Sequence, residues 1–194
     1  MGLILEENTS MILAVLNNKG GVGKTTTAVN LAAALARGSR RVLLVDLDSQ
    51  GSASLSLGVQ RRELEPSIAE VLLGGEAAAP LIRSTQVKGL DLLTGSMALA
   101  NVDLALAEEE GRENRLREAL EPLRSHYSTI LLDCPPSLSL LPVNALLAAD
   151  RFLVPVTPQY LALEGLVNLM EAVDKVQQGF GGGASLLGFL LTMV

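Results

Sequence analysis

Short apolar runs recur along the chain, and each is typical of a strand buried on both faces of a parallel sheet. The clearest runs predict strands at about 11–17, 41–46, 129–133, 151–155 and 186–194. A weaker run predicts a further strand at 90–93. Between these runs, apolar residues follow helical spacing, which predicts helices at about 25–37, 67–73, 97–106, 112–124 and onward from 160 to 178. Alternating strands and helices predict an α/β fold built from right-handed βαβ units.

The junction between the first strand and the first helix is rich in glycine. Residues 17–27 read Asn-Asn-Lys-Gly-Gly-Val-Gly-Lys-Thr-Thr-Thr. Such a junction suits a phosphate-binding loop, because backbone N–H groups and the positive end of the helix point at the same anion. Lys24 supplies charge for the terminal phosphates, and Thr25 supplies a hydroxyl for Mg²⁺. We therefore expect ATP and Mg²⁺ at Lys19, Gly20, Gly21, Val22, Gly23, Lys24, Thr25 and Thr26.

The loop departs from the common pattern G-x-x-x-x-G-K-[ST] at its first position, where the chain has Asn18 followed by Lys19. The run Lys-Gly-Gly-Val-Gly-Lys-Thr-Thr resembles the deviant Walker A motif of the ParA/MinD ATPases. This resemblance implies that Lys19 reaches across a dimer interface to the partner's phosphates, so that Lys19 and Lys24 both take part in catalysis. It also implies a P-loop NTPase fold, a three-layer sandwich with a mostly parallel central sheet and helices on both faces.

Two acids follow the second strand, in the segment Asp-Leu-Asp-Ser-Gln-Gly at 46–51. Acids just past the carboxyl end of a strand next to the loop face the nucleotide. The segment resembles the Walker A′ motif of the ParA group, with Ser49 in place of the usual proline. By this resemblance Asp48 orients or activates the attacking water, and Asp46 and Asp48 both belong to the magnesium region. A turn or helix-capping role is the alternative for each acid.

A second acid-terminated strand is predicted at 129–133, and it ends in Asp133. This is the Walker B pattern, in which a buried strand delivers a carboxylate that holds Mg²⁺ through water. The next residues, Cys-Pro-Pro-Ser at 134–137, resemble the switch II segment of ParA and Soj proteins, as residues 156–165 resemble a later part of that family. The two prolines fix the backbone where it responds to the γ-phosphate. We expect Cys134 to be a small buried filler.

Composition narrows the function classes. A net charge of −6 argues against a strongly basic nucleic-acid surface. A single cysteine excludes a disulfide framework and a zinc site within the chain, and also a cluster held by two cysteines per subunit, as in the nitrogenase iron protein. No apolar run reaches the roughly 18 residues of a membrane span, so no membrane role is expected and a reducing cytoplasm is the default location.

These observations predict one P-loop ATPase domain at 11–194, preceded by an N-terminal extension at 1–10 and C-terminally incomplete relative to the family. The resemblance implies an ATP-dependent homodimer that hydrolyses ATP slowly and is activated by a ParB-like protein. It further implies a cytoplasmic, nucleoid-associated protein that segregates plasmid or chromosomal DNA or positions other cargo. Nonspecific DNA binding is implied for the full-length family, although no residue of this chain shows a DNA contact.

Two alternatives stay open at this point. A MinD-like, membrane-associated division ATPase shares the loop but needs a C-terminal amphipathic helix that is absent here. The residue sequence of its Walker A′ motif also differs. A nucleotide-binding module without turnover would keep the phosphate loop and lose the adenine pocket. Nucleotide affinity and phosphate release, measured together, separate such a module from a working ATPase.

Overall fold

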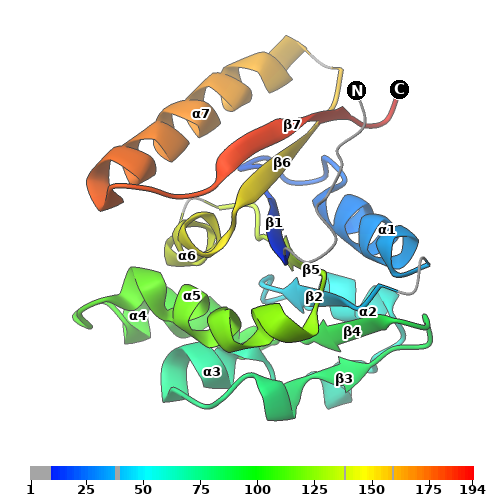
Figure 1. The fold of residues 1–194 in the computed structure, drawn as a ribbon. Coiled ribbons are helices and arrows are strands. Elements are labelled where there is room, and N and C mark those ends of the chain that lie inside the picture. The colour runs from blue at the N-terminus through cyan, green and yellow to red at the C-terminus, as the bar shows by residue number, and fades with distance from the viewer. Residues whose placement is uncertain (1–9, 38–39, 138, 159) are drawn as a thin grey trace.

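The computed structural model describes residues 10–37, 40–137, 139–158 and 160–194, without the side chains of 160–164. Its centre is a seven-stranded sheet in the order β3-β4-β2-β5-β1-β6-β7, shown in Figure 1. Every strand pair is parallel except β3–β4. The strands are β1 Met11–Val15, β2 Val42–Asp46, β3 Arg83–Ser84, β4 Leu90–Leu93, β5 Thr129–Asp133, β6 Arg151–Val156 and β7 Ser185–Leu191.

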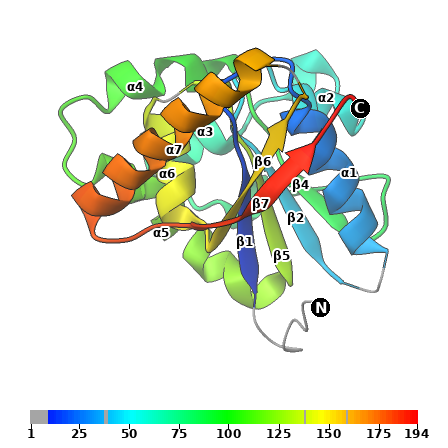
Figure 2. The same ribbon diagram turned by 90° about the horizontal axis from the view of Figure 1, so that it is seen from above.

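Helices cover both faces of this sheet, as Figures 1 and 2 show. One face carries α1 and α2, and the other carries α3 to α7. The α-helices are α1 Lys24–Ala36, α2 Ser52–Ser56, α3 Ile68–Gly74, α4 Val102–Ala105, α5 Arg115–Leu120, α6 Leu140–Ala148 and α7 Tyr160–Phe180. The 3₁₀ segments are η1 Arg61–Glu63, η2 Ala79–Leu81, η3 Met97–Asn101, η4 Arg112–Asn114 and η5 Glu121–His126. The predicted three-layer α/β architecture is confirmed.

Small side chains bring α1 close to the sheet. Ala28, Ala32 and Ala36 recur every four residues, so they lie on one side of the helix, and all three are buried against β-strand residues. Alanine is also the best helix former, so the same residues favour the helix and its close packing. The N-terminus of α1 is thereby held at the carboxyl end of the central strands.

Strand register brings the predicted acids to one edge of the sheet. Asp133 at the end of β5 pairs in register with Val15 of β1 on one side and with Asp46 of β2 on the other. Since the phosphate loop leaves β1 directly after Val15, the loop and both acids meet at the carboxyl ends of three neighbouring strands.

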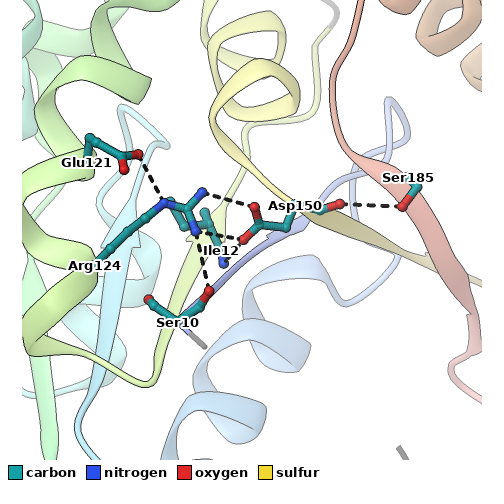
Figure 3. Close-up of polar contacts among 6 residues, drawn as sticks. All are labelled: Ser10, Ile12, Glu121, Arg124, Asp150 and Ser185. Carbon is teal, nitrogen blue, oxygen red and sulfur yellow. Dashed lines mark hydrogen bonds and ion pairs between the residues drawn. The ribbon is translucent and has the colours of Figure 1, made fainter. Parts of the chain in front are cut away.

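The opposite ends of the strands are joined by a charged network, drawn in Figure 3. The Arg124 guanidinium donates to both carboxylate oxygens of Asp150, at 2.9 and 3.0 Å, and to Glu121 at 3.1 Å. Asp150 also accepts from the backbone N–H of Ile12 at 2.7 Å, and its carbonyl accepts from the Ser185 N–H at 3.1 Å. The network thus links η5 to the starts of β1, β6 and β7.

Several local expectations need adjustment. The helix predicted at 112–124 is divided into η4, α5 and η5. Pro122 supplies no backbone N–H to continue the α-helix, which explains why α5 gives way to η5. The short antiparallel strand β3, and helices α2 and α6, carried too few residues of regular spacing to be predicted. Residues 1–9 of the predicted N-terminal extension lie outside the described residues, so the predicted domain boundary stays a prediction. Within the described ranges, none of the helices combines the length and the apolar composition that a membrane span needs.

Candidate nucleotide-binding site

The loop between β1 and α1 has the open backbone that an anion requires. Gly21 and Gly23 have φ of 73° and 86°, values that side-chain-bearing residues rarely adopt. A Cβ built on Gly20 or Gly21 would meet no atom within 4 Å, so the backbone at these two residues is not covered on that side by other parts of the described chain. Gly23 also forms the N-cap of α1, which places the positive helix end at this space.

The start of the loop is tied to the neighbouring strand. The buried Asn17 side chain donates from Nδ2 to the Pro155 carbonyl of β6 at 2.8 Å, and its Oδ1 accepts from the Lys19 N–H at 3.0 Å. Sequence reasoning missed this role, because the strand partner lies 138 residues away. Asn17 therefore fixes the point at which Lys19 leaves the sheet.

Lys24 is a buried lysine whose ammonium points back along the loop. Only 7% of the residue is exposed, and Nζ donates to the Lys19 carbonyl at 3.0 Å. Burial lowers the pKa of Lys24, and the nearby charges of Asp133 and Asp48 oppose that shift. One hydrogen bond leaves further N–H groups of the ammonium that an anion could accept from, and the role of Lys24 in binding the terminal phosphates stays a prediction.

Asp133 is the most unusual group of the site. It is completely buried, and neither carboxylate oxygen has a partner with regular hydrogen-bond geometry among the described residues, although the Thr25 hydroxyl lies close enough to act on the carboxylate as a donor. Burial raises the pKa of Asp133 to about 7, and Asp46 adds to the rise, while the nearby Thr25 hydroxyl and Lys24 ammonium counteract it. A buried carboxylate without partners is costly, so a cation or its bound water is the expected partner.

Asp46 differs from Asp133 although the two are paired in register. Its carboxylate accepts from the Ser54 N–H at 2.8 Å, from the Ser54 hydroxyl at 2.7 Å and from the Asp48 N–H at 3.2 Å. Burial raises the pKa of Asp46, and the Ser54 hydrogen bonds counteract the rise. These bonds position α2 and the Asp48 turn, which is a structural role for Asp46. The magnesium role expected for Asp46 stays a prediction.

Asp48 lies at the turn that follows β2 and is half-buried. Its Oδ1 accepts from the Gln50 N–H at 2.9 Å, and its carbonyl accepts from the Gly51 N–H at 2.9 Å. The turn role that the sequence left open is therefore present, and it orients the Asp48 carboxylate. Gly95 packs beneath this turn, where a Cβ would lie 2.7 Å from the carbonyl oxygens of Asp46 and Asp48.

The fit of Mg²⁺ follows from this donor set. No group of three His, Cys, Asp or Glu side chains that could hold a metal ion occurs in the described part of the chain. A hydroxyl from Thr25 and a carboxylate from Asp133 suit a cation that keeps several waters and takes phosphate oxygens as its other ligands, which is the usual habit of Mg²⁺. The residues present therefore fit a magnesium ion that arrives with a nucleotide. Cys134 is buried and its pKa is raised by burial, which agrees with the predicted filler role.

Comparison with known proteins identifies the family of this chain. The AAA_31 family, described as an AAA domain, matches residues 10–181. The chain is 45% identical over 182 residues to the chromosome partitioning protein ParA of Myxococcus xanthus, and it is 43% identical over 183 residues to the sporulation initiation inhibitor protein Soj of Bacillus subtilis. Each match covers 94% of this chain, which spans 64% of the Myxococcus protein and 72% of the Bacillus protein.

A solved structure shows the same fold. Cobyrinic acid a,c-diamide synthase from Mycobacterium smegmatis, crystallised with an ATP analogue and magnesium, superposes with a TM-score of 0.89 at 40% identity, over 95% of this chain and 75% of that one. The predicted resemblance to ParA and Soj is confirmed by identity over nearly the whole chain. The chain belongs to the AAA_31 family of AAA domains, as a homologue of the ParA and Soj partitioning proteins.

Proposed function

We propose that this chain is the nucleotide-binding part of a ParA-type ATPase, a switch that dimerises with ATP and hydrolyses it slowly. The observation that carries the proposal is Asp133, whose two buried carboxylate oxygens lack partners among the described residues. It lies beside Lys24 and Thr25, at the foot of an open glycine loop. A magnesium–triphosphate supplies both charges that this arrangement needs, a cation for Asp133 and an anion for Lys24.

Residues of the loop bind and orient the phosphates in this proposal. The N–H groups of Gly20, Gly21 and Gly23 and the end of α1 donate to phosphate oxygens, and Lys24 neutralises the terminal phosphates. Bound Mg²⁺ would draw charge from the phosphate oxygens, with Thr25 and Asp133 as the protein groups that hold it and its waters. The fixed loop backbone keeps these donors in place without rearrangement during the reaction.

Asp48 is proposed to orient the attacking water. Its Oδ1 is held by the Gln50 N–H, so the carboxylate has a fixed direction from which to accept a hydrogen bond from water. Orientation of water beside a γ-phosphate, rather than strong proton abstraction, fits a slow hydrolysis. Asp46 supports this geometry through its bond to the Asp48 N–H.

Lys19 is proposed to act across a dimer. Its carbonyl and N–H are held by Lys24 and Asn17, so the backbone at Lys19 is fixed at the mouth of the loop. A partly exposed lysine at that position can reach phosphates bound by a second subunit. The partner in the dimer is another copy of this chain. A ParB-like activator protein and nonspecific DNA are the further proposed partners. The proposed location is the cytoplasm, at the nucleoid. Segregation of DNA or of another cargo is the corresponding cellular task.

Light scattering with ADP or a slowly hydrolysed ATP analogue tests this proposal. We expect wild type to be monomeric with ADP and dimeric with the analogue, and Lys19→Ala to stay monomeric with both. Lys88→Ala is a matched control, because Lys88 is an exposed lysine in the β3–β4 connection, and it should behave as wild type. Equal dimerisation of Lys19→Ala would remove the cross-subunit role.

Phosphate release separates the ATPase from a module without turnover. Wild type should release phosphate from ATP and Mg²⁺, and Asp48→Ala should bind ATP with the affinity of wild type while phosphate release falls to background. Binding without release in wild type would favour the inactive module. The Mycobacterium structure is named for a different reaction, but the relatives named for partitioning, at 43–45% identity, favour the partitioning function over that reaction and over a MinD-like one.

A further inference from the structure

The residue that directly follows β7, Thr192, contacts the phosphate loop through its side chain. The Thr192 hydroxyl donates to the Val22 carbonyl at 2.9 Å, and the Thr192 methyl carbon Cγ2 lies 3.7 Å from the position of a Cβ built on Gly23. Thr192 lies beyond residues 10–181, which the family match covers. No motif of the sequence pointed to it, since 170 residues separate it from Val22.

Thr192 is itself anchored to the sheet. Its N–H donates to the Val156 carbonyl at 2.9 Å, and that carbonyl lies 3.3 Å from its hydroxyl. Val156 is the last residue of β6, the strand that β7 joins in parallel. Thr192 directly follows β7, and this backbone hydrogen bond to the last residue of β6 fixes the residue whose hydroxyl holds the loop.

Because a peptide bond is planar, the contact with the Val22 carbonyl also determines the orientation of the Gly23 N–H. The described chain has a cis peptide bond only at Glu65–Pro66, so the Val22–Gly23 peptide is trans. In a planar trans peptide, the C=O of one residue and the N–H of the next point in opposite directions. Holding the Val22 carbonyl toward Thr192 therefore turns the Gly23 N–H to the side away from Thr192.

We propose that Thr192 is a positioning residue for phosphate binding, because its hydroxyl fixes the Val22–Gly23 peptide with the Gly23 N–H directed at the nucleotide. The inference rests on the proposed nucleotide site. Without the hydroxyl, this peptide can rotate, since Gly23 tolerates both signs of φ. The bound state then has to order a peptide that wild type holds in advance.

Titration calorimetry with Mg²⁺–ADP and with the slowly hydrolysed ATP analogue tests the inference. Thr192→Val keeps the shape and removes the hydroxyl, and we expect both nucleotides to bind about five- to tenfold more weakly, as for one lost hydrogen bond. Thr192→Ser keeps the hydroxyl and should bind within about twofold of wild type. Ser128→Ala is the control, because it removes a hydroxyl that donates to a carbonyl, that of Arg41, at the far ends of the strands.

A spectroscopic readout separates positioning from simple stabilisation. The amide resonance of Gly23 should shift on ADP binding in wild type and Thr192→Ser, and shift much less in Thr192→Val. Thr192→Ala, which adds no bulk, should reproduce the loss and covers the case in which the valine variant does not fold. If Thr192→Val and Thr192→Ala bind ADP as tightly as wild type, the inference is wrong and the proposed function stands. If wild type binds neither nucleotide, the proposed function fails and the inference falls with it.

Discussion

Two aspartates at opposite ends of the strands differ in whether their carboxylate oxygens have hydrogen-bond partners. Asp150, at the amino ends of the strands, has both oxygens paired with Arg124 and a third bond from the Ile12 N–H (Figure 3). Asp133, at the carboxyl ends, is buried with neither oxygen paired among the described residues. Folding provides the Asp150 carboxylate with donors, whereas the Asp133 carboxylate still needs a partner.

The difference separates stability from function within one fold. A paired carboxylate contributes to stability, whereas an unpaired buried one costs free energy until a ligand arrives. The strand order places both groups, because amino ends collect at one edge of a parallel sheet and carboxyl ends at the other. Substitutions at the two edges should therefore change stability in opposite directions, and only those at the carboxyl ends should change nucleotide binding.

The largest effect on binding is expected for Lys24→Ala. It removes the buried ammonium beside the loop, and loss of a charge-assisted contact of about 3 kcal/mol weakens nucleotide binding roughly a hundredfold. Calorimetry with ADP and Mg²⁺ measures this, with Lys88→Ala as the exposed-lysine control. An affinity within about threefold of wild type would show that Lys24 does not bind the phosphates.

Asp133→Asn should weaken binding and strengthen the fold. The folded-state pKa of about 7 lies above the ordinary 3.8, so the stability linked to Asp133 is present below pH 4 and is lost as the pH rises to about 7. Asparagine carries no charge, so the variant should be more stable than wild type at pH 8, by a few kcal/mol at most, and similar to it at pH 4. Its affinity for Mg²⁺–nucleotide should fall about tenfold or more.

Chemical denaturation at pH 4, 6 and 8, without nucleotide, measures the stability part of this prediction. Asp150→Asn serves as the comparison, because its carboxylate is already paired and should gain no stability from neutralisation at pH 8. A lower stability of Asp133→Asn than of wild type at pH 8 would contradict the view of Asp133 as an unsatisfied group.

Arg124→Ala should weaken the fold and leave nucleotide binding unchanged. It removes the bonds to Asp150 and Glu121, and because these partners are partly exposed we expect a loss of only about 1–2 kcal/mol. Nucleotide affinity of the folded variant should not change. Thermal unfolding and calorimetry measure the two effects, and Arg117→Ala, at an exposed position of α5, is the control. A loss of affinity with unchanged stability would break the separation of the two edges.

The smallest effect is expected for Tyr127→Phe. The Tyr127 hydroxyl donates to Asp91 at 2.9 Å, and Asp91 also pairs with Arg41, so the carboxylate keeps a partner and the loss should be about 1 kcal/mol. Burial and Asp91 raise the pKa of Tyr127 to about 12, so wild type loses this contribution as the pH rises from about 10 to 12. Denaturation at pH 8 and pH 11 measures both, and the phenylalanine variant should lose less stability between these two values.

Local patterns were sufficient for much of this molecule. The strand at 129–133 was predicted at its observed bounds, and β1, β2 and α1 to within a residue or two, because apolar runs and alanine-rich helices carry their signal within a few residues. The loop could be recognised for the same reason. Glycines with positive φ, the lysine and the threonine are consecutive in the chain, so their chemistry is visible without the fold.

Contacts between residues that are far apart in the chain could not be predicted from the sequence. The pairing of Arg124 with Asp150, the bond from Asn17 to Pro155 and the contact of Thr192 with Val22 join residues 26 to 170 positions apart. Their side chains are ordinary in local context, so no pattern distinguishes them from other surface or loop residues. The short strand β3 shows the same limit, since two residues carry no periodicity.

Asp46 and Asp133 show which properties the sequence determines and which only the tertiary structure decides. The sequence by itself determined that Asp46 and Asp133 end buried strands beside a phosphate loop, since apolar runs and glycine chemistry are local properties. Only the tertiary structure decided that Ser54 satisfies Asp46 and that Asp133 is left without a partner among the described residues. The reason is physical, because hydrogen-bond satisfaction depends on which distant groups folding brings within 3 Å, and strand register and helix packing determine that.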